Sequence, residues 1–180
     1  ALGYPPSSTI GLLKTLMHTG HLRFDQRTKL YVPTLRVVLL GDWLRDTPLA
    51  SDRLRRALER VVERTGESAF LSTPNDVAMQ VTHIVRGPQP ITLNVVPGHT
   101  VPMASSAVGH AFLATRGERE RAALLRRIRR EYPDATPPDV DALEMRLAAV
   151  RRRGWAAAYD VLPGVGAVAV ALPADPATPV

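Results

Sequence analysis

The first fifty residues of the chain are rich in groups that bind phosphate. They carry six Lys or Arg residues against three acids, and Ser7, Ser8 and Thr9 follow a Pro-Pro pair that suits the start of a helix. Hydroxyls, the free amides of a helix N-terminus and basic side chains all donate hydrogen bonds to phosphate oxygens. The pattern is compatible with binding to the backbone of a nucleic acid, but by itself it does not predict it, because many small α/β segments have the same order of elements.

A second group of reactive residues lies between His99 and His110. Ser105 and Ser106 stand between these histidines, so a serine nucleophile with a histidine base has to be considered. The sequence lacks the Gly-x-Ser-x-Gly turn that exposes such a serine in many hydrolases. A ligand site is another interpretation, since the small side chains of residues 104–108 leave room and helix amides with serine hydroxyls suit a carboxylate. Close packing of a helix on a sheet is the alternative explanation.

Metal binding and a second basic surface are further alternatives. The spacings of His83, His99 and His110 match no standard metal site, and the chain has no cysteine, so we expect neither metal nor cofactor. Arginines cluster at 126–130 and 151–153 and could bind nucleic acid. Four acids interleave with them: Glu118, Glu120, Glu131 and Glu144. We therefore favour a solvated, ion-paired surface for these arginines.

Composition indicates a soluble globular protein of one or two domains. Of its 180 residues, 45% are hydrophobic and 22% are charged, and no stretch approaches the roughly 20 apolar residues that span a bilayer. No signal peptide is recognisable and no disulfide can form, so we expect a cytoplasmic protein without membrane contact. Arginine supplies nearly all of the positive charge, which a GC-rich coding bias would also produce.

Periodicity predicts a helix that runs to Thr19 and then a hairpin. Ser7 or Ser8 is expected to cap the helix and Gly20 to end it. Its buried face is expected to carry Ile10, Leu13, Leu16 and Met17. In the hairpin, residues 25–28 form the turn. One face of the hairpin is expected to carry Leu22, Phe24, Leu30 and Val32, and the other Arg23, Lys29 and Tyr31.

The middle of the chain predicts a linker helix followed by an antiparallel meander. Residues 34–44 are apolar almost all round a helical wheel, as in a helix buried on several sides, and Trp43 is expected to seal subunit packing. We place a domain boundary near residue 47. A helix from Ser51 to Gly66 should then present a stripe of Leu54, Leu58, Val61 and Val62. Three strands are predicted at 68–73, 77–85 and 91–95.

The last eighty residues predict three helices and two strands. A loop after Gly98 leads into a helix of small residues that ends near Ala114. Two further helices are predicted at 118–132 and 139–153, the second with Val140, Leu143, Leu147 and Val150 inward. Strands at 155–159 and 165–172 follow.

Three motifs together resemble the IclR family of bacterial transcription regulators, over nearly the whole chain. Residues 2–10 with 12–16 and 20–22 resemble the family's recognition helix and the entry to its wing. Residues 98–114 resemble its effector-domain signature. Arg153-Gly154-Trp155, with residues 161–165, resembles the segment that closes the effector pocket.

The resemblance implies an α+β fold in three parts. A partial winged helix-turn-helix (1–33) is joined by a linker helix (34–47) to a GAF-like antiparallel-sheet effector domain (48–180), whose pocket lies between the sheet and the helix of residues 105–114. The function implied is a non-enzymatic regulator, with repression favoured over activation. Such a protein binds operator DNA as a homodimer or tetramer and responds to a small-molecule effector, for example a carboxylate or an aromatic metabolite.

The resemblance also assigns residues to the two sites. DNA contacts fall to Pro6, Ser7, Ser8, Thr9, Gly11, Lys14, Thr15, Arg23, Arg27 and Lys29. Effector contacts fall to Met103, Ala104, Ser105, Ser106, Ala107, Val108, Tyr159, Asp160, Ala167 and Val168. The chain departs from the family at Gly11, where arginine is usual.

The resemblance begins within the winged-helix motif, so we expect two helices before Ala1 and a strand and helix after Val180 in a longer protein. The alternative function is a stand-alone small-molecule-binding domain, or an enzyme, with an incidental basic N-terminus. The dependence of DNA affinity on salt distinguishes these classes, because only a true DNA binder loses affinity steeply as salt rises.

Overall fold

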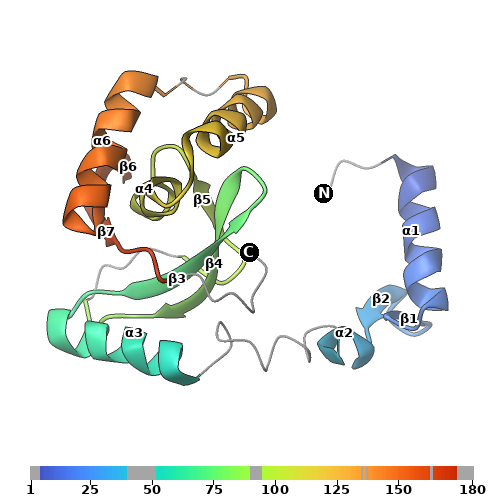
Figure 1. Ribbon diagram of the computed structural model, residues 1–180. Helices are drawn as coiled ribbons and strands as arrows, with labels where there is room; N and C mark the ends of the chain where they lie inside the picture. Colours follow the sequence, from blue (N-terminus) through green and yellow to red (C-terminus); the bar gives the residue numbers. More distant parts are fainter. Residues whose placement is uncertain are drawn as a thin grey trace. The chain divides into compact units, whose positions relative to one another are not determined.

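The chain divides into two compact units, Ala1–Leu54 and Arg55–Val180, which we call the first and the second unit. The computed structural model describes residues 5–39, 52–89, 95–134, 136, 138–162 and 164–173. Helices and antiparallel strands occur in both units (Figure 1), so the predicted α+β class is confirmed. Within the described ranges, no helix has the length and apolar character needed to cross a membrane.

The first unit begins with helix α1 (Pro6–His18). A proline suits the first helical position because its missing amide hydrogen would have no helical partner there. The N-cap is Pro5, which makes no side-chain hydrogen bond. The prediction that Ser7 or Ser8 caps α1 is therefore wrong, since both serines already lie in the first turn.

The apolar face of α1 is only partly covered. Leu13 and Leu16 are half-buried, but Ile10 and Met17 are 54% and 39% exposed. None of the residues of α1 is fully buried. The expected burial of Ile10 and Met17 is thus not found in the described part of the chain.

Strands β1 (Leu22–Asp25) and β2 (Leu30–Pro33) form the predicted hairpin, but the predicted faces are wrong. Phe24 is paired with Tyr31 and their ring centroids lie 5.1 Å apart, whereas Arg23 is paired with Val32. Residues directly opposite each other in an antiparallel pair share a face. A four-residue turn between Asp25 and Leu30 sets this register, and the sequence pattern did not reveal it.

Of the predicted linker helix, only α2 (Arg36–Leu39) falls within the described residues. Residues 40–51, which include Trp43 and the boundary placed near residue 47, lie outside them.

The second unit contains a three-stranded antiparallel sheet in the order β3-β4-β5. Helix α3 (Asp52–Thr65) precedes it and ends at Gly66, whose positive φ of 73° favours glycine. Strands β3 (Ala69–Asn75) and β4 (Ala78–Val85) agree with the sequence prediction. The third strand is β5 (Thr100–Pro102), in a stretch predicted to be a loop, while residues 91–94 of the predicted strand lie outside the described part of the chain.

Three helices and a second hairpin complete this unit. Helices α4 (Ala107–Ala114), α5 (Glu118–Glu131) and α6 (Val140–Arg153) match the predicted segments, and Asp139 caps α6 by accepting hydrogen bonds from two backbone amides at 3.1 Å. Strands β6 (Ala156–Leu162) and β7 (Val165–Ala169) pair antiparallel, and β7 is shorter than predicted.

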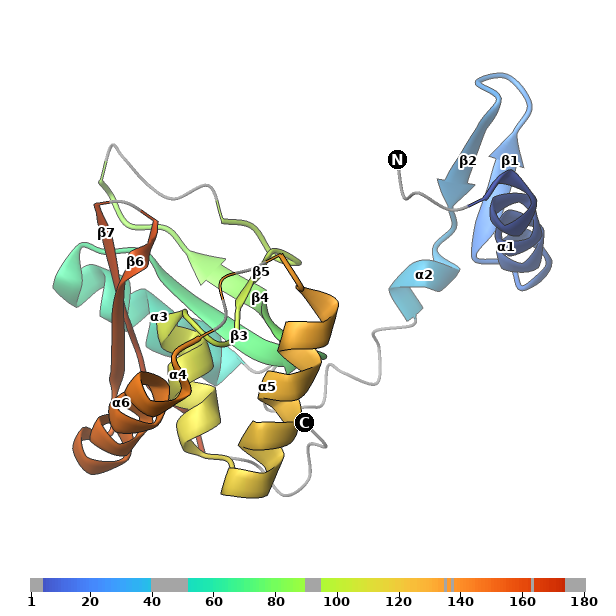
Figure 2. The ribbon, with the colours of Figure 1, turned by 90° about the horizontal axis from the view of Figure 1, so that it is seen from above.

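The core of the second unit forms around α4, which lies between α5 and α6 in both ribbon views (Figures 1 and 2). One cluster of buried side chains joins α4, α6 and the first sheet: Met79, Met103, Leu113, Leu143 and Leu147. A second cluster joins α4, α6 and the β6–β7 hairpin: Ala107, Ala111, Val150, Ala156 and Ala169. Val140, predicted to point inward from α6, is 54% exposed because it lies in the first turn, beyond the first cluster.

Candidate functional site

The N-terminal half of α1 presents hydroxyls and amides without acidic neighbours. Ser7 and Ser8 are exposed in the first turn, and α1 contains no Asp or Glu. The hydroxyls of Thr9 and Thr15 donate to the carbonyl oxygens of Pro5 and Gly11 at 3.1 and 3.0 Å, so they are partly engaged by the helix itself. A phosphate near this turn would meet backbone amides and two unengaged serines.

Of the remaining candidates on α1, Lys14 is exposed and Gly11 leaves open space around its Cα. Lys14 is the only Lys or Arg of α1. The apolar side chains of Ile10 and Leu12 are exposed as well, so exposure alone does not separate a DNA-facing side from a packing side.

The β1–β2 hairpin carries the other predicted cations, Arg23 in strand β1 and Arg27 and Lys29 in the turn, all of them exposed. Asp25 organises the turn, because its carboxylate accepts hydrogen bonds from the amides of Arg27 and Thr28 at 2.9 and 3.2 Å. These amide bonds hold the pKa of the Asp25 carboxyl below its usual value. The turn therefore keeps its shape, and its basic side chains reach outward from a fixed backbone.

Two contacts fix α1 to the base of the hairpin. The hydroxyl of Thr34 donates to the Gly20 carbonyl oxygen at 2.6 Å, and the Arg36 guanidinium donates to the Thr19 carbonyl oxygen at 2.9 Å. A cation at the C-terminus of a helix also interacts favourably with the helix dipole. The structure thus brings the predicted cations of the helix and the hairpin onto one small unit with a defined internal geometry.

In the second unit, the backbone at Met103 lies against α4 at Gly109. A Cβ atom placed on Gly109 would lie 1.9 Å from the Met103 carbonyl oxygen. Only glycine allows this approach, because the contact involves backbone atoms that cannot rotate away. The predicted effector loop is therefore held directly on its helix.

Side-chain hydrogen bonds hold the same loop at two more points. The Ser106 hydroxyl caps α4 by accepting a hydrogen bond from the Gly109 amide at 3.1 Å. His110 Nε2 lies 2.9 Å from the Ala104 carbonyl oxygen, so this nitrogen must carry the hydrogen and donate it. Burial of the ring lowers the pKa of His110, which keeps the imidazole neutral in the folded protein.

These bonds engage Ser106 and His110 with the backbone and not with each other. His83 and His99 are exposed. Among the residues that the structure describes, no three His, Asp or Glu side chains are placed to hold a metal ion.

Several predicted effector residues are in fact part of the core. Met103 and Ala107 are 1% and 2% exposed, and Ala107 packs with Ala111 against Ala156 and Ala169 of the hairpin. Half-buried Val108 and Ala167 contact the same cluster. Small side chains thus allow close packing of α4 on the hairpin, which is the alternative explanation that the sequence left open.

The other predicted effector residues are accessible but lie apart. Ser105 is exposed on the loop, and Ala104 is half-buried. Tyr159 and Val168 are more than two-thirds exposed on the face of the β6–β7 hairpin that points away from α4. The Tyr159 ring covers Gly166, where a Cβ would lie 3.0 Å from the ring. The side chain of Asp160 lies outside the described residues, and effector binding by the whole set stays a prediction.

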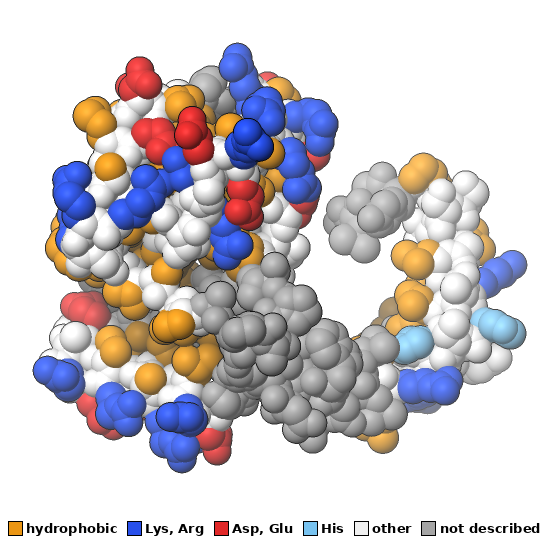
Figure 3. Space-filling model, viewed as in Figure 1, with side chains coloured by type: hydrophobic (Ala, Val, Ile, Leu, Met, Phe, Trp, Pro, Cys, Tyr) orange, Lys and Arg blue, Asp and Glu red, His pale blue; other side chains and the backbone are white. Residues whose placement is uncertain are grey.

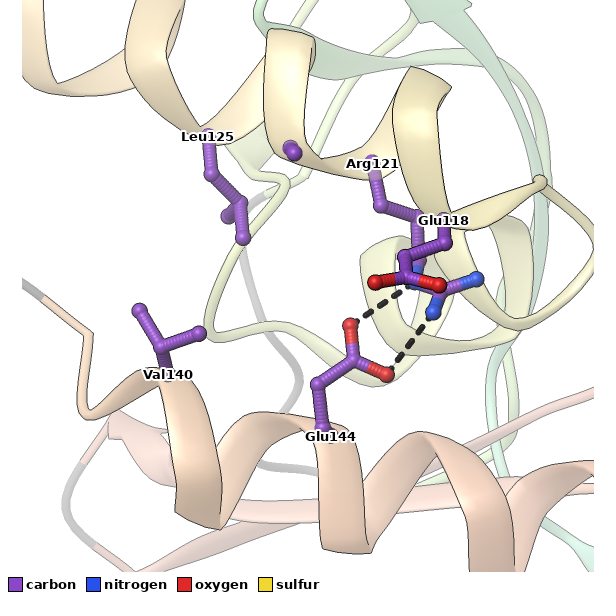
Figure 4. A pocket seen from close by; sticks show the side chains of 6 residues that line it. Glu118, Arg121, Leu125, Val140 and Glu144 are labelled. Carbon is purple, nitrogen blue, oxygen red and sulfur yellow. Dashed lines mark hydrogen bonds and ion pairs between the residues drawn. The ribbon is translucent and has the colours of Figure 1, made fainter.

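A cavity that the sequence did not predict lies between α5 and α6 (Figure 4). It measures about 310 Å³ and is lined by Glu118, Arg121, Ala122, Leu125, Val140 and Glu144. Arg121, only 7% exposed, donates two hydrogen bonds of 2.8 Å to the Glu144 carboxylate and one to the Arg116 carbonyl oxygen. Figure 4 shows this ion pair and Glu118 at one end of the cavity and Leu125 and Val140 at the other.

Comparison with known proteins points to one family. The family model described as the bacterial transcriptional regulator IclR C-terminal domain matches residues 45–175. The chain is 29% identical over 157 residues to the HTH-type transcriptional regulator BhcR of Paracoccus denitrificans, an alignment that covers 86% of this chain and 56% of the relative. The chain therefore spans little more than half the length of that curated relative.

Solved structures have the same fold. An IclR transcriptional regulator from Alicyclobacillus acidocaldarius superimposes with a TM-score of 0.67 at 25% identity, covering 94% of this chain and 69% of the other. An IclR homolog from Microbacterium hydrocarbonoxydans, in complex with 4-hydroxybenzoate, superimposes with a TM-score of 0.69 at 19% identity, covering 95% and 71%. At that identity the second likeness shows the fold alone.

We predict that Gly109→Ala destabilises the second unit by about 3 kcal/mol, the upper end of the range for overpacking. The added methyl group cannot fit beside the Met103 carbonyl oxygen. Urea unfolding followed by circular dichroism measures the effect. Gly117→Ser is the control, because open space surrounds Gly117 and serine suits its N-cap position, so this variant should be at least as stable as the parent. A Gly109→Ala variant of unchanged stability would contradict the geometry.

We predict that stability falls as the pH drops below about 6.5, and that His110→Gln removes part of this loss. The ordinary histidine pKa of 6.5 applies to the unfolded chain, while burial lowers the pKa in the folded state. Between those two values the unfolded state binds the extra proton, so protonation favours unfolding by at most about 1.4 kcal/mol per pH unit. Urea unfolding at pH 7.5 and 5.0 tests this, with the exposed His99→Gln as control. Equal pH dependence in the parent and His110→Gln would refute it.

Proposed function

The chain belongs to the IclR family of bacterial transcriptional regulators, and from this premise we propose that it represses transcription by binding operator DNA under the control of a small-molecule effector. The observation that carries the proposal is the family match over residues 45–175, supported by the cations that α1 and the β1–β2 hairpin present together. The family consists of transcriptional regulators and not of enzymes, which disfavours the enzymatic alternative.

We assign the functions to three parts of the chain. Residues 1–33 would contact DNA, residues 34–47 would link, and residues 48–180 would bind the effector. The family model for the C-terminal domain begins at residue 45, close to the start of the third part. The division into two compact units between Leu54 and Arg55 is compatible with separate DNA-binding and effector-binding modules.

The DNA contact would combine two kinds of phosphate ligand. Ser7 and Ser8, with the free amides of the first turn, would bind one phosphate at the N-terminus of α1. Lys14, Arg27 and Lys29 would bind neighbouring phosphates as exposed point charges. Sequence would be read by the exposed side of α1 in the major groove, as in other helix-turn-helix proteins.

Effector control requires that the ligand binds two arrangements of the protein with different affinity. The close contact of Ala107 with the β6–β7 hairpin makes such a difference physically reasonable, because a ligand that enters there has to separate α4 from the hairpin. The change would reach the paired DNA-binding units of a homodimer or tetramer through the linker. An aromatic carboxylate is the class of effector we propose, since a family member of the same fold is known in complex with 4-hydroxybenzoate.

We predict that Lys14→Ala and Arg27→Ala each weaken binding to the promoter DNA of the chain's own gene and flatten its salt dependence. Each lost phosphate contact should change the slope of log K against log salt by about 0.9. Fluorescence anisotropy between 50 and 200 mM salt measures this. Arg152→Ala, which removes an exposed cation from α6, should leave the slope unchanged. Failure of the parent chain to bind this DNA even at low salt would refute the proposed function.

We predict that 4-hydroxybenzoate raises the melting temperature of the chain, and that Ser105→Ala and Ala107→Val weaken this effect. The added methyl groups at residue 107 occupy the space between α4 and the hairpin that the ligand would need. Titration calorimetry gives the affinities. Ser7→Ala, in the first unit, is the matched control and should leave ligand affinity unchanged. Binding that neither variant alters would place the ligand elsewhere and contradict the assigned residues.

A further inference from the structure

The exposed side of α5 carries a row of arginines. Helical spacings of seven and four residues place Arg119, Arg126 and Arg130 within about 40° of one another around the helix axis. All three side chains are exposed. At 1.5 Å per residue the row is about 16 Å long. Figure 3 shows Lys and Arg side chains gathered over this helix.

Acidic side chains do not neutralise this row. The ion pairs involving α5 use other arginines: Arg116–Glu120, Arg121–Glu144 and Arg127–Asp76. Within the described part of the chain, Arg119, Arg126 and Arg130 form no ion pair. The predicted pairing of interleaved acids with arginines thus occurs, but on the flanks and the inner side of the helix. The outer row keeps three unneutralised charges.

Side-chain packing and hydrogen bonds on the inner side of α5 fix this helix to the rest of the second unit. Leu124, Leu125 and Ile128 of α5 pack against the first core cluster. The two hydrogen bonds between Arg121 and Glu144 fix α5 to α6 on the same inner side. Binding to the row would therefore order only three side chains and no backbone, which lowers its entropic cost.

Helix stability does not explain the row. Arg130 in the last turn interacts favourably with the helix dipole, but Arg119 lies in the first turn, where a cation is unfavourable. The excess of arginine in the composition accounts for their number. Their alignment opposite the half-buried Ile128 suits a binding partner with regularly spaced negative charge.

We propose that Arg119, Arg126 and Arg130 bind the phosphate backbone of duplex DNA as a second contact, made by the second unit. The inference rests on the proposed function for its choice of DNA over other polyanions. Duplex DNA rises 3.4 Å per base pair, so the row extends along about five base pairs. Its contacts are independent of sequence, and its role is to add affinity and to lengthen the protected segment of DNA.

Anisotropy of the full chain with a 40-base-pair duplex of random sequence tests the proposal between 50 and 200 mM salt. The triple variant Arg119→Ala, Arg126→Ala, Arg130→Ala should flatten the slope of log K against log salt by about 2.7, at about 0.9 per contact. The corresponding triple lysine variant should keep the parent slope, since lysine preserves the charge. A lysine variant as weak as the alanine variant, with both folded by circular dichroism, would overturn the proposal.

Helix α3 supplies a matched control. Arg53, Arg60 and Arg64 have the same spacings of seven and four residues and are exposed, with Glu63 three residues from Arg60 and Glu59 hydrogen-bonded to Arg55. The triple alanine variant on α3 removes the same net charge and, because we propose no DNA contact on α3, should change the slope by less than one contact. An equal loss in the two triple variants would show a general charge effect and overturn the proposal.

A comparison with Lys14→Ala/Arg27→Ala separates this inference from the proposed function. If the α5 variant and the double variant each flatten the slope of log K against log salt, the result supports both the α5 contact and the proposed function. Flattening by the double variant alone overturns the α5 contact and leaves the proposed function standing. Flattening by the α5 variant alone supports the α5 contact and counts against α1 and the hairpin. If the α5 variant loses binding to polyglutamic acid but not to the duplex, the partner is an acidic protein and the proposal is overturned.

Discussion

The contact between the Met103 carbonyl and the backbone of Gly109 fixes the centre of the second unit. It brings a loop and a helix closer than any side chain at residue 109 would allow. The Ser106 cap and the hydrogen bond from His110 to Ala104 then hold the loop on both sides of this point. Because backbone atoms make the contact, the loop cannot shift relative to α4 by a change of side-chain rotamer.

Helix α4 in turn is packed on two sides, and this determines what a ligand can do there. Leu113 lies in the cluster shared with β4 and α6, while Ala107 and Ala111 lie against the β6–β7 hairpin. A ligand between α4 and the hairpin has to replace alanine contacts with its own. Effector affinity would differ between two arrangements of the protein because the free energy of this exchange would differ between them.

Local signals allowed much of the fold to be predicted, and long-range contacts account for most of what was missed. Asp139 and Gly154 mark the ends of α6 because a cap and a left-handed residue act within one turn. Strand β5 has three residues and exists only because β4 lies beside it. The separation of Tyr159 from Ala107 by the hairpin follows from strand alternation, but the sequence did not show which face α4 would cover. The hydrogen bonds of Arg121 with Glu144 join residues 23 positions apart, so pairing of these charges was expected only in general terms.

The arginines of this chain serve different purposes, which their number alone does not reveal. Arg36 caps α1, Arg121 joins α5 to α6, and the Arg153 guanidinium lies 3.7 Å from the centre of the Trp155 ring while donating to its carbonyl oxygen. Each of these cations has its charge or its donors used within the fold. A coding bias toward arginine can supply such residues anywhere, and Arg53, Arg60 and Arg64 of α3 have the same spacings as the α5 row. Charge on this protein is therefore best assigned to partners after the internal contacts have been subtracted, and on α5 that subtraction leaves a row with no acid three or four helical residues away.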